Sequence, residues 1–205
     1  MFTALVAFGL ALGGSQAMST APSDILANAS AVLSKVTSRP VRAFSTRDFG
    51  RDAYADARSV LVDETDADRL LARVRHQLGP GLVAFIGTER SLADTKPDGV
   101  ELVVGPGETQ FDILRIAASD AVNFDKETED LIKVLKTWDV AFGIDILRAQ
   151  TDRIVLHLKS MPIDMKKFTA DVYEFCPDIV DQGTGSIDKL QTEITTTRTV
   201  FLWWD

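Results

Sequence analysis

The sequence has one cysteine and two histidines, and it has no run of about 18 uncharged apolar residues. The single cysteine, Cys176, cannot form an internal disulfide. It also provides no partner thiolate for a structural zinc site, and the histidines are not paired at ligand spacing. The longest apolar run, residues 2–12, is too short to span a bilayer as a helix. We therefore expect no metal centre of this type and no integral membrane segment after residue 17.

Positive charge is also scarce. The chain has 22 Lys and Arg against 30 Asp and Glu, a net charge of −8. No window combines basic residues with aromatic residues, so nucleic acid is not an expected partner and a basic protein is electrostatically favoured. The glycine pairs in residues 79–81, 105–107 and 183–185 lack the patterns of phosphate-binding loops, and no Gly-x-Ser-x-Gly motif occurs. These motifs predict no cofactor and no catalytic residue.

Residues 1–17 have the pattern of a signal peptide, because the apolar run is followed by small residues at Ser15 and Ala17. No Lys or Arg precedes the run, and Met18 is an alternative start. The first interpretation predicts a periplasmic or secreted protein, and the second a cytoplasmic one.

Residues 18–106 read as an N-terminal α/β portion. Apolar residues recur at helical spacing in residues 23–35 and 66–78. Short β-prone runs occupy the stretches between them and after them, at residues 41–44, 59–62, 82–86 and 100–104.

Residues 107–205 predict further helices and a hairpin. Helices are expected at residues 111–121 and 128–138, from Pro162 through Cys176, and after an N-cap at Ser186. The hairpin pairs residues 143–149 with residues 153–159. The last strand, residues 199–205, is apolar on both faces, so we expect it inside the sheet or covered on both sides.

The pattern as a whole predicts an α+β fold, with an antiparallel or mixed sheet and helices packed mainly on one face. We expect the N-terminal portion to share one core with residues 107–205.

The stretch EFCPDIVDQG, residues 174–183, and the final Trp-Trp-Asp resemble the bacterial domain-of-unknown-function family 4253. The resemblance covers residues 107–205, and the residues that carry it include Asn123, Trp138, Cys176, Pro177 and Gly183. The family usually has Tyr after the asparagine, where this chain has Phe124. The resemblance implies no established activity, although a link to toxin immunity has been proposed for the family.

Cys176 has two interpretations. A nucleophilic cysteine needs a nearby base, but His76 lies in a distant predicted helix and His157 on the wet face of a strand. Cys176 also continues an apolar helical stripe and precedes Pro177, which favours a buried, inert thiol at a helix end.

The carboxylates of Glu174, Asp178 and Asp181 are spaced about one helical turn apart or less, so they could converge on a hard cation. The calcium-loop spacing is absent, which favours a solvated acidic helix end without metal. Without a metal site, we expect these residues to form a surface that binds a partner. The adjacent tryptophans, which lie on opposite faces of the last strand, belong to this surface. Its residues are Glu174, Asp178, Asp181, Gln182, Trp203, Trp204 and Asp205.

We expect a non-enzymatic protein-binding protein, of which a toxin-immunity protein is one form. The alternative is a hydrolase or metal-dependent enzyme that uses the carboxylates around Cys176.

Overall fold

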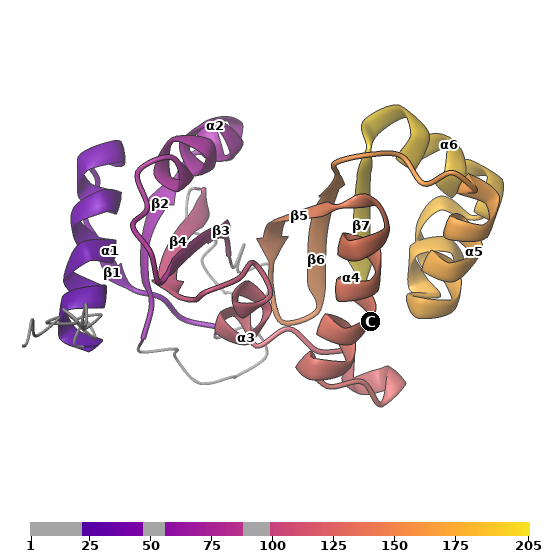
Figure 1. The fold of residues 1–205 in the computed structure, drawn as a ribbon, viewed down its shortest axis with the longest axis horizontal. Helices are drawn as coiled ribbons and strands as arrows, with labels where there is room; N and C mark the ends of the chain where they lie inside the picture. The colour runs from indigo at the N-terminus through magenta and orange to yellow at the C-terminus, as the bar shows by residue number, and fades with distance from the viewer. Residues whose placement is uncertain (1–21, 47–55, 88–98) are drawn as a thin grey trace, which may run out of the picture.

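The computed structural model of the chain describes residues 22–46, 56–87 and 99–205. The predicted signal peptide therefore lies outside the described residues. The N-terminal half contains two helices and four strands in the described ranges (Figure 1). In chain order these are α1 (Pro22–Thr37), β1 (Arg42–Ala43), β2 (Arg58–Val62), α2 (Glu64–Arg75), β3 (Leu82–Ile86) and β4 (Val100–Pro106).

The C-terminal half adds helices and a three-stranded antiparallel block. In chain order its elements are α3 (Asp112–Ala117), the 3-10 helix η1 (Val122–Phe124), α4 (Thr128–Phe142), β5 (Ile144–Ala149), β6 (Arg153–Leu158), α5 (Met165–Phe175), the π-helix η2 (Ile179–Thr184), α6 (Ile187–Thr197) and β7 (Thr199–Trp203).

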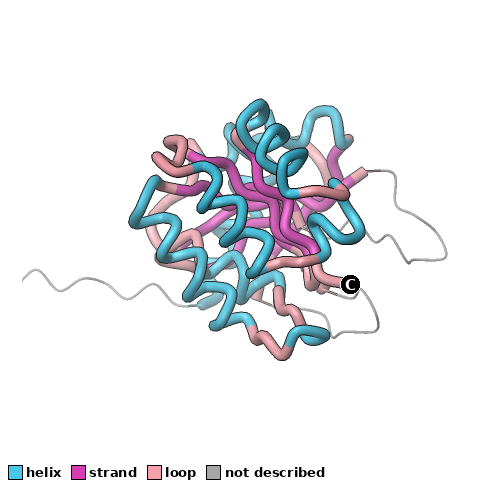
Figure 2. Tube along the Cα trace, turned by 90° about the vertical axis from the view of Figure 1, so that its right-hand side faces the viewer, coloured by secondary structure: helices cyan, strands magenta, loops and turns pink. Residues whose placement is uncertain are grey.

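All these strands form one seven-stranded sheet in the order β1-β2-β4-β3-β5-β6-β7. Neighbouring strands are antiparallel except β3 and β5, which pair in parallel at Ile86 and Arg148. The sheet therefore consists of two antiparallel blocks joined by a short parallel contact. Figure 2 shows the strands in the middle of the molecule with helices on the outside.

Alternating side chains divide the apolar residues between two cores on opposite faces of the sheet. In β3, Phe85 belongs to the larger core, whereas Ala84 and Ile86 belong to the smaller one. The larger core receives buried residues from α3, α4, α5 and α6, and the smaller core from α1 and α2. The larger core also contains Phe44 and Ala57 of the N-terminal half.

The fold class expected from the sequence is confirmed, since helices surround a mixed sheet. The predicted hairpin is present, and Ile154, Leu156 and Leu158 are buried on one face as expected. Ser186 caps α6 by accepting a hydrogen bond from the backbone N–H of Lys189. No helix in the described ranges is long and apolar enough to cross a membrane.

Several helix boundaries differ from the prediction. The helix expected over residues 66–78 ends at Arg75, and the one expected over residues 128–138 continues to Phe142. Two further differences have a clear local cause. The helix expected over residues 111–121 ends at Ala117, because Ala118 takes a left-handed conformation with φ 52° and the backbone N–H of Ser119 turns back to the carbonyl of Leu114. The helix expected from Pro162 begins only at Met165, since Asp164 is its N-cap.

The position predicted for the last strand is wrong. Within the described residues β7 pairs only with β6, so it is an edge strand. Val200 and Leu202 are buried on one face, but Phe201 on the other face remains 42% exposed. Figure 1 shows α5 and α6 beyond this edge, where α6 and η2 contact β7.

Candidate binding site

The last three residues of the chain are held by the end of α5 and the residues that follow it. Residues 203–205 each make a hydrogen bond to a residue of the segment 175–178. Trp203 bonds to Cys176, the indole N–H of Trp204 donates to the carbonyl of Phe175 at 3.3 Å, and the backbone N–H of Asp205 donates to Asp178 at 2.9 Å. The signature stretch and the final Trp-Trp-Asp are thus one structural unit.

Cys176 has a structural role in this unit. Its thiol donates to the carbonyl oxygen of Trp203 at 2.9 Å and accepts from the backbone N–H of Trp203 at 3.3 Å. Cys176 lies just after α5, with φ −138° and ψ 83°, as expected for a residue that precedes proline. Burial raises the pKa of the thiol to about 11, so it is protonated at neutral pH. The prediction that Cys176 is buried is confirmed.

The three carboxylates around Cys176 do not converge. Asp178 is buried, where it accepts hydrogen bonds from the side chain of Gln182 at 3.0 Å and from the backbone of Asp205, so its expected place on a solvated helix end is wrong. Its partner Asp205 lies 27 residues away in the chain. Asp181 is exposed and accepts from the hydroxyl of Tyr173 at 3.1 Å, which raises the pKa of that tyrosine.

The remaining residues predicted around these carboxylates are spread out. Glu174 is exposed on α5, and Gln182 and Gly183 are exposed on η2. Pro177 is half-buried. Within the described ranges, no group of three His, Cys, Asp or Glu side chains could hold a metal ion. His76 is exposed and His157 is half-buried, and neither contacts Cys176 through a hydrogen bond.

The tryptophans differ in burial. Trp204 is 4% exposed and packs edge-to-face against Phe175, with ring centroids 5.4 Å apart. Trp138 is also buried and contacts the rings of Phe175 and Phe168 in the same manner. Trp203 is half-buried. Two of the three tryptophans are therefore core residues, and Trp203 alone has substantial exposed surface.

A hollow that we call the acidic groove opens beside Trp204. It consists of two adjoining hollows that share Asp120 and Val122, one of about 360 Å³, which we call the inner part, and one of about 600 Å³, which we call the outer part. The inner part is lined by Asp120, Ala121, Val122, Asn123, Thr151, Asp152, Trp204 and Asp205. The outer part is lined by Asp120, Val122, Asp125, Lys126, Glu127, Thr128 and Glu129. Among the residues that the structure describes, the lining thus holds six different acidic residues and one lysine.

The turn between β5 and β6 forms one wall of the groove and is fixed from two sides. On one side, the hydroxyl of Ser119 donates to the carbonyl of Gln150 at 2.6 Å, and the backbone N–H of Asp120 donates to the carbonyl of Thr151 at 2.8 Å. On the other side, the backbone N–H of Trp204 donates to the carbonyl of Asp152 at 3.1 Å. The wall is therefore preformed.

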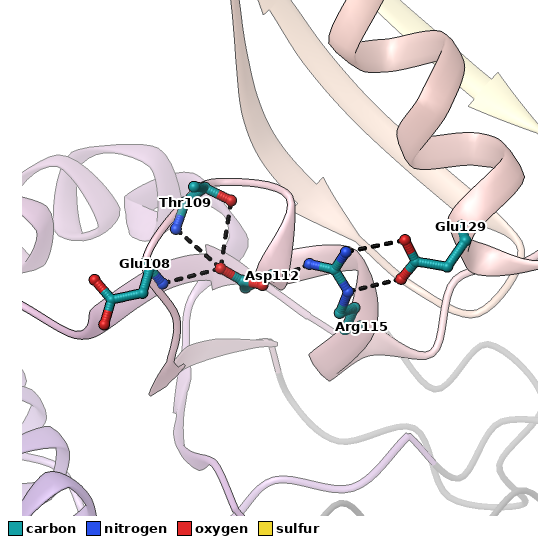
Figure 3. A network of polar contacts seen from close by, with 5 residues as sticks. All are labelled: Glu108, Thr109, Asp112, Arg115 and Glu129. Atoms are coloured by element: carbon teal, nitrogen blue, oxygen red, sulfur yellow. Dashed lines mark hydrogen bonds and ion pairs between the residues drawn. The ribbon is translucent and has the colours of Figure 1, made fainter.

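A polar network fixes the outer wall (Figure 3). The carboxylate of Asp112 accepts hydrogen bonds from the backbone N–H groups of Glu108 and Thr109, each at 2.9 Å. Arg115 donates to Asp112 at 2.6 Å and to both carboxylate oxygens of Glu129 at 2.7 and 3.0 Å. The network joins α3 to the first turn of α4, where Glu129 lines the groove.

The same contacts shift the pKa values of both carboxyl groups. Burial alone would raise the pKa of Asp112, but the hydrogen bonds from Thr109 and Arg115 outweigh it, and the pKa is lowered. The hydrogen bonds from Arg115 lower the pKa of Glu129. Glu129 is therefore ionised but already paired.

Two other acidic residues of the groove, Asp125 and Asp205, differ from Glu129. The side-chain carboxylates of Asp125 and Asp205 are exposed and make no hydrogen bond or ion pair within the part of the chain that the structure describes. Val122 lies in both parts of the groove with 66% of its surface exposed. Thr151 lines the inner part and is only 2% exposed, yet its hydroxyl oxygen has no hydrogen-bond partner in the described ranges.

A second hollow, which we call the apolar cleft, lies on the other side of β7. It has a volume of about 240 Å³. It is lined by Ile179, Gly183, Thr184, Leu190, Glu193, Ile194, Thr199, Phe201 and Trp203. Adjacent residues Trp203 and Trp204 thus line different hollows, in agreement with the expectation that they point to opposite faces.

Sequence reasoning predicted only part of these hollows. Asn123, Trp204 and Asp205 line the acidic groove, and Gly183 and Trp203 line the apolar cleft. Asp120 and Asp152 were missed, because each lies in a connection with no distinguishing local motif.

The fold and these hollows define a mixed α/β protein with a hollow on each side of its C-terminal strand. Residues 101–205 match the family described as domain of unknown function (DUF4253), and the chain belongs to this family. The resemblance seen in the sequence is confirmed, and the match begins within β4, earlier than the expected start at residue 107. Comparisons with curated proteins and with solved structures found no match.

Proposed function

We propose that this protein is a binding protein whose acidic groove receives a basic segment of a partner protein. The observation that carries the proposal is the lining of the groove, with six acidic residues against one lysine. Opposite charge in a concave surface concentrates field lines and speeds association with a cationic partner. Toxin immunity is one biological role that such binding would serve.

Two further features support binding of a protein segment. Val122 offers an exposed apolar contact within the groove, and interfaces combine apolar centres with charged rims. Thr151 offers a buried hydroxyl that has no partner in the described ranges and is therefore available to hydrogen-bond a bound group.

The test uses neutralising substitutions that preserve shape. Asp125→Asn combined with Asp205→Asn removes the two unpaired carboxylates of the groove, and asparagine tolerates the left-handed conformation at position 125, where φ is 53°. The matched control is Glu174→Gln combined with Asp188→Asn, which makes the same charge change at exposed sites outside the groove.

The probe is a fluorescein-labelled peptide of alternating lysine and valine, titrated at low and high salt. We expect the groove variant to weaken binding about tenfold at low salt, mainly through slower association, and the control to change it by less than about twofold. Equal weakening by both variants would show a response to net charge alone and would refute the groove as the site.

A further inference from the structure

The hydrogen-bonding register of β7 shows which of its backbone groups face away from β6, towards the edge of the sheet. The backbone N–H of Trp204 donates to Asp152, and the carbonyl of Arg198 accepts from the N–H of Leu158. These bonds place the even-numbered residues of β7 in hydrogen-bonded pairs with β6. Thr199, Phe201 and Trp203 therefore direct their N–H and C=O groups away from β6.

Two of these three outward-facing residues have partners from their own chain. Both backbone groups of Trp203 bond to the thiol of Cys176. The N–H of Thr199 donates to the hydroxyl of Thr197 at 3.1 Å. Phe201 lies between these two residues, and its outward N–H and C=O have no partner in the part of the chain that the structure describes.

Phe201 lines the apolar cleft together with Thr199 and Trp203, so the cleft borders this part of β7. Leu190 and Ile194 of α6 and Ile179 of η2 line the cleft as nearly buried core residues, whereas Phe201 is 42% exposed. Among the described residues of the lining, Glu193 is the one charged residue. The site therefore combines a backbone donor, a backbone acceptor, an apolar hollow and a single negative charge.

We propose that the apolar cleft binds a short extended segment of a partner protein. One residue of that segment pairs its backbone with the N–H and C=O of Phe201, its apolar side chain fills the cleft, and a neighbouring Lys or Arg faces Glu193. Such binding resembles the addition of a strand to the sheet. Only one residue of the segment can pair with β7, because Thr199 and Trp203 already have hydrogen-bond partners at the edge.

The same contacts favour a short segment over a second copy of this chain. Pairing of two β7 strands about Phe201 would also bring Thr199 of one copy opposite Trp203 of the other. Cys176 and Thr197 already bond to those positions at the edge. A segment that needs only the peptide unit of Phe201 avoids this competition.

The experiment titrates the full-length ¹⁵N-labelled protein with a blocked hexapeptide, Ser-Thr-Leu-Lys-Thr-Ser, and follows backbone amide and indole resonances. Gly183→Leu is the blocking variant, because Gly183 lines the cleft and a Cβ added there meets no atom closer than 3.5 Å. Thr195→Leu adds the same side chain on the exposed part of α6 outside the cleft and is its control. Glu193→Lys is a second variant that leaves η2 unchanged.

We expect saturable shifts of the Phe201 amide and the Trp203 indole. Binding should weaken about tenfold with Gly183→Leu, with Glu193→Lys, or when glycine replaces the leucine of the peptide. Thr195→Leu should bind as the wild type does. The groove variant carrying Asp125→Asn and Asp205→Asn should also keep this binding, so failure here is distinguishable from failure of the acidic groove.

Three results would overturn the proposal. They are an unshifted Phe201 amide at millimolar peptide, shifts that Gly183→Leu and Glu193→Lys both leave unchanged, and concentration-dependent dimerisation that broadens Phe201 in the absence of peptide. The last result would assign the edge to a second copy of the chain.

Discussion

The substitution Cys176→Ala isolates the role of the thiol at the edge of β7. The side chain has no exposed surface, so losing its sulfur removes about 1 kcal/mol of apolar burial. It also leaves the N–H and C=O of Trp203 without their partner. An unsatisfied buried group costs about 1 to 3 kcal/mol, and the lower half of that range applies because Trp203 is half-buried and thiols bond weakly. We expect a total loss of about 2 to 3 kcal/mol.

Urea unfolding at pH 7 measures this loss. With a slope of about 2 kcal/mol per molar urea, the midpoint should fall by about 1 to 1.5 M without a change in slope. Cys176→Ser keeps a donor and an acceptor, so it should be more stable than Cys176→Ala. If the serine variant is the less stable of the two, the sulfur stabilises the protein only through apolar packing, and its hydrogen bonds to Trp203 contribute nothing.

The same thiol gives a pH dependence of known sign. Burial raises its pKa from 9.0 to about 11 in the folded protein. The stability that the buried thiol contributes is therefore complete below pH 9 and is lost as the pH rises towards 11, by about 3 kcal/mol in all. The stability difference between the wild type and Cys176→Ala should shrink over this interval. A difference that stays constant from pH 8 to 11 would contradict the burial of the thiol.

Three further substitutions test the rest of the site. Trp204→Ala should cost about 3 to 5 kcal/mol and Trp203→Ala clearly less, as measured by thermal or urea unfolding, since only Trp204 is in the core. Asp178→Asn should destabilise the protein by about 1 to 2 kcal/mol, because the carboxylate is buried and hydrogen-bonded. Asp181→Asn should change stability by less than about 0.5 kcal/mol. Equal effects of the two substitutions would refute the buried role of Asp178. Folding lowers the pKa of Asp112, so the ionised carboxylate stabilises the protein above the pKa of the unfolded state, near 4. This stabilisation is lost as the pH falls below that value. Asp112→Asn should therefore be less stable than the wild type at pH 7 and should approach its stability at pH 3.

Local sequence patterns were sufficient for most secondary structure. The alternation of Ile154, Leu156 and Leu158 predicts a strand with one buried face, and the position of Ser186 predicts a helix start. Both properties depend on neighbouring residues alone. The burial of Cys176 was also predictable, because a helical apolar stripe followed by proline is itself a local pattern.

The order of strands in the sheet was not predictable in this way. Residues 200–204 are all apolar, so both faces of the last strand are apolar. A central strand has this pattern, and so does an edge strand that is covered by a helix. In the described residues β7 pairs with β6 on one side only, and this edge position leaves Phe201 exposed beside the apolar cleft.

Asp178 shows the same division between sequence and tertiary structure. Aspartate side chains are mostly exposed in folded proteins, so an aspartate just after a helix is expected to face solvent. Here the carboxylate is buried because it accepts hydrogen bonds from Gln182, four residues away, and from the backbone of Asp205, 27 residues away. The sequence determined the helices, the strands and the acidic character of the chain, since these depend on residue type and local period. Tertiary structure decided which carboxylates are buried partners and which line a groove, because that depends on contacts between residues far apart in the chain.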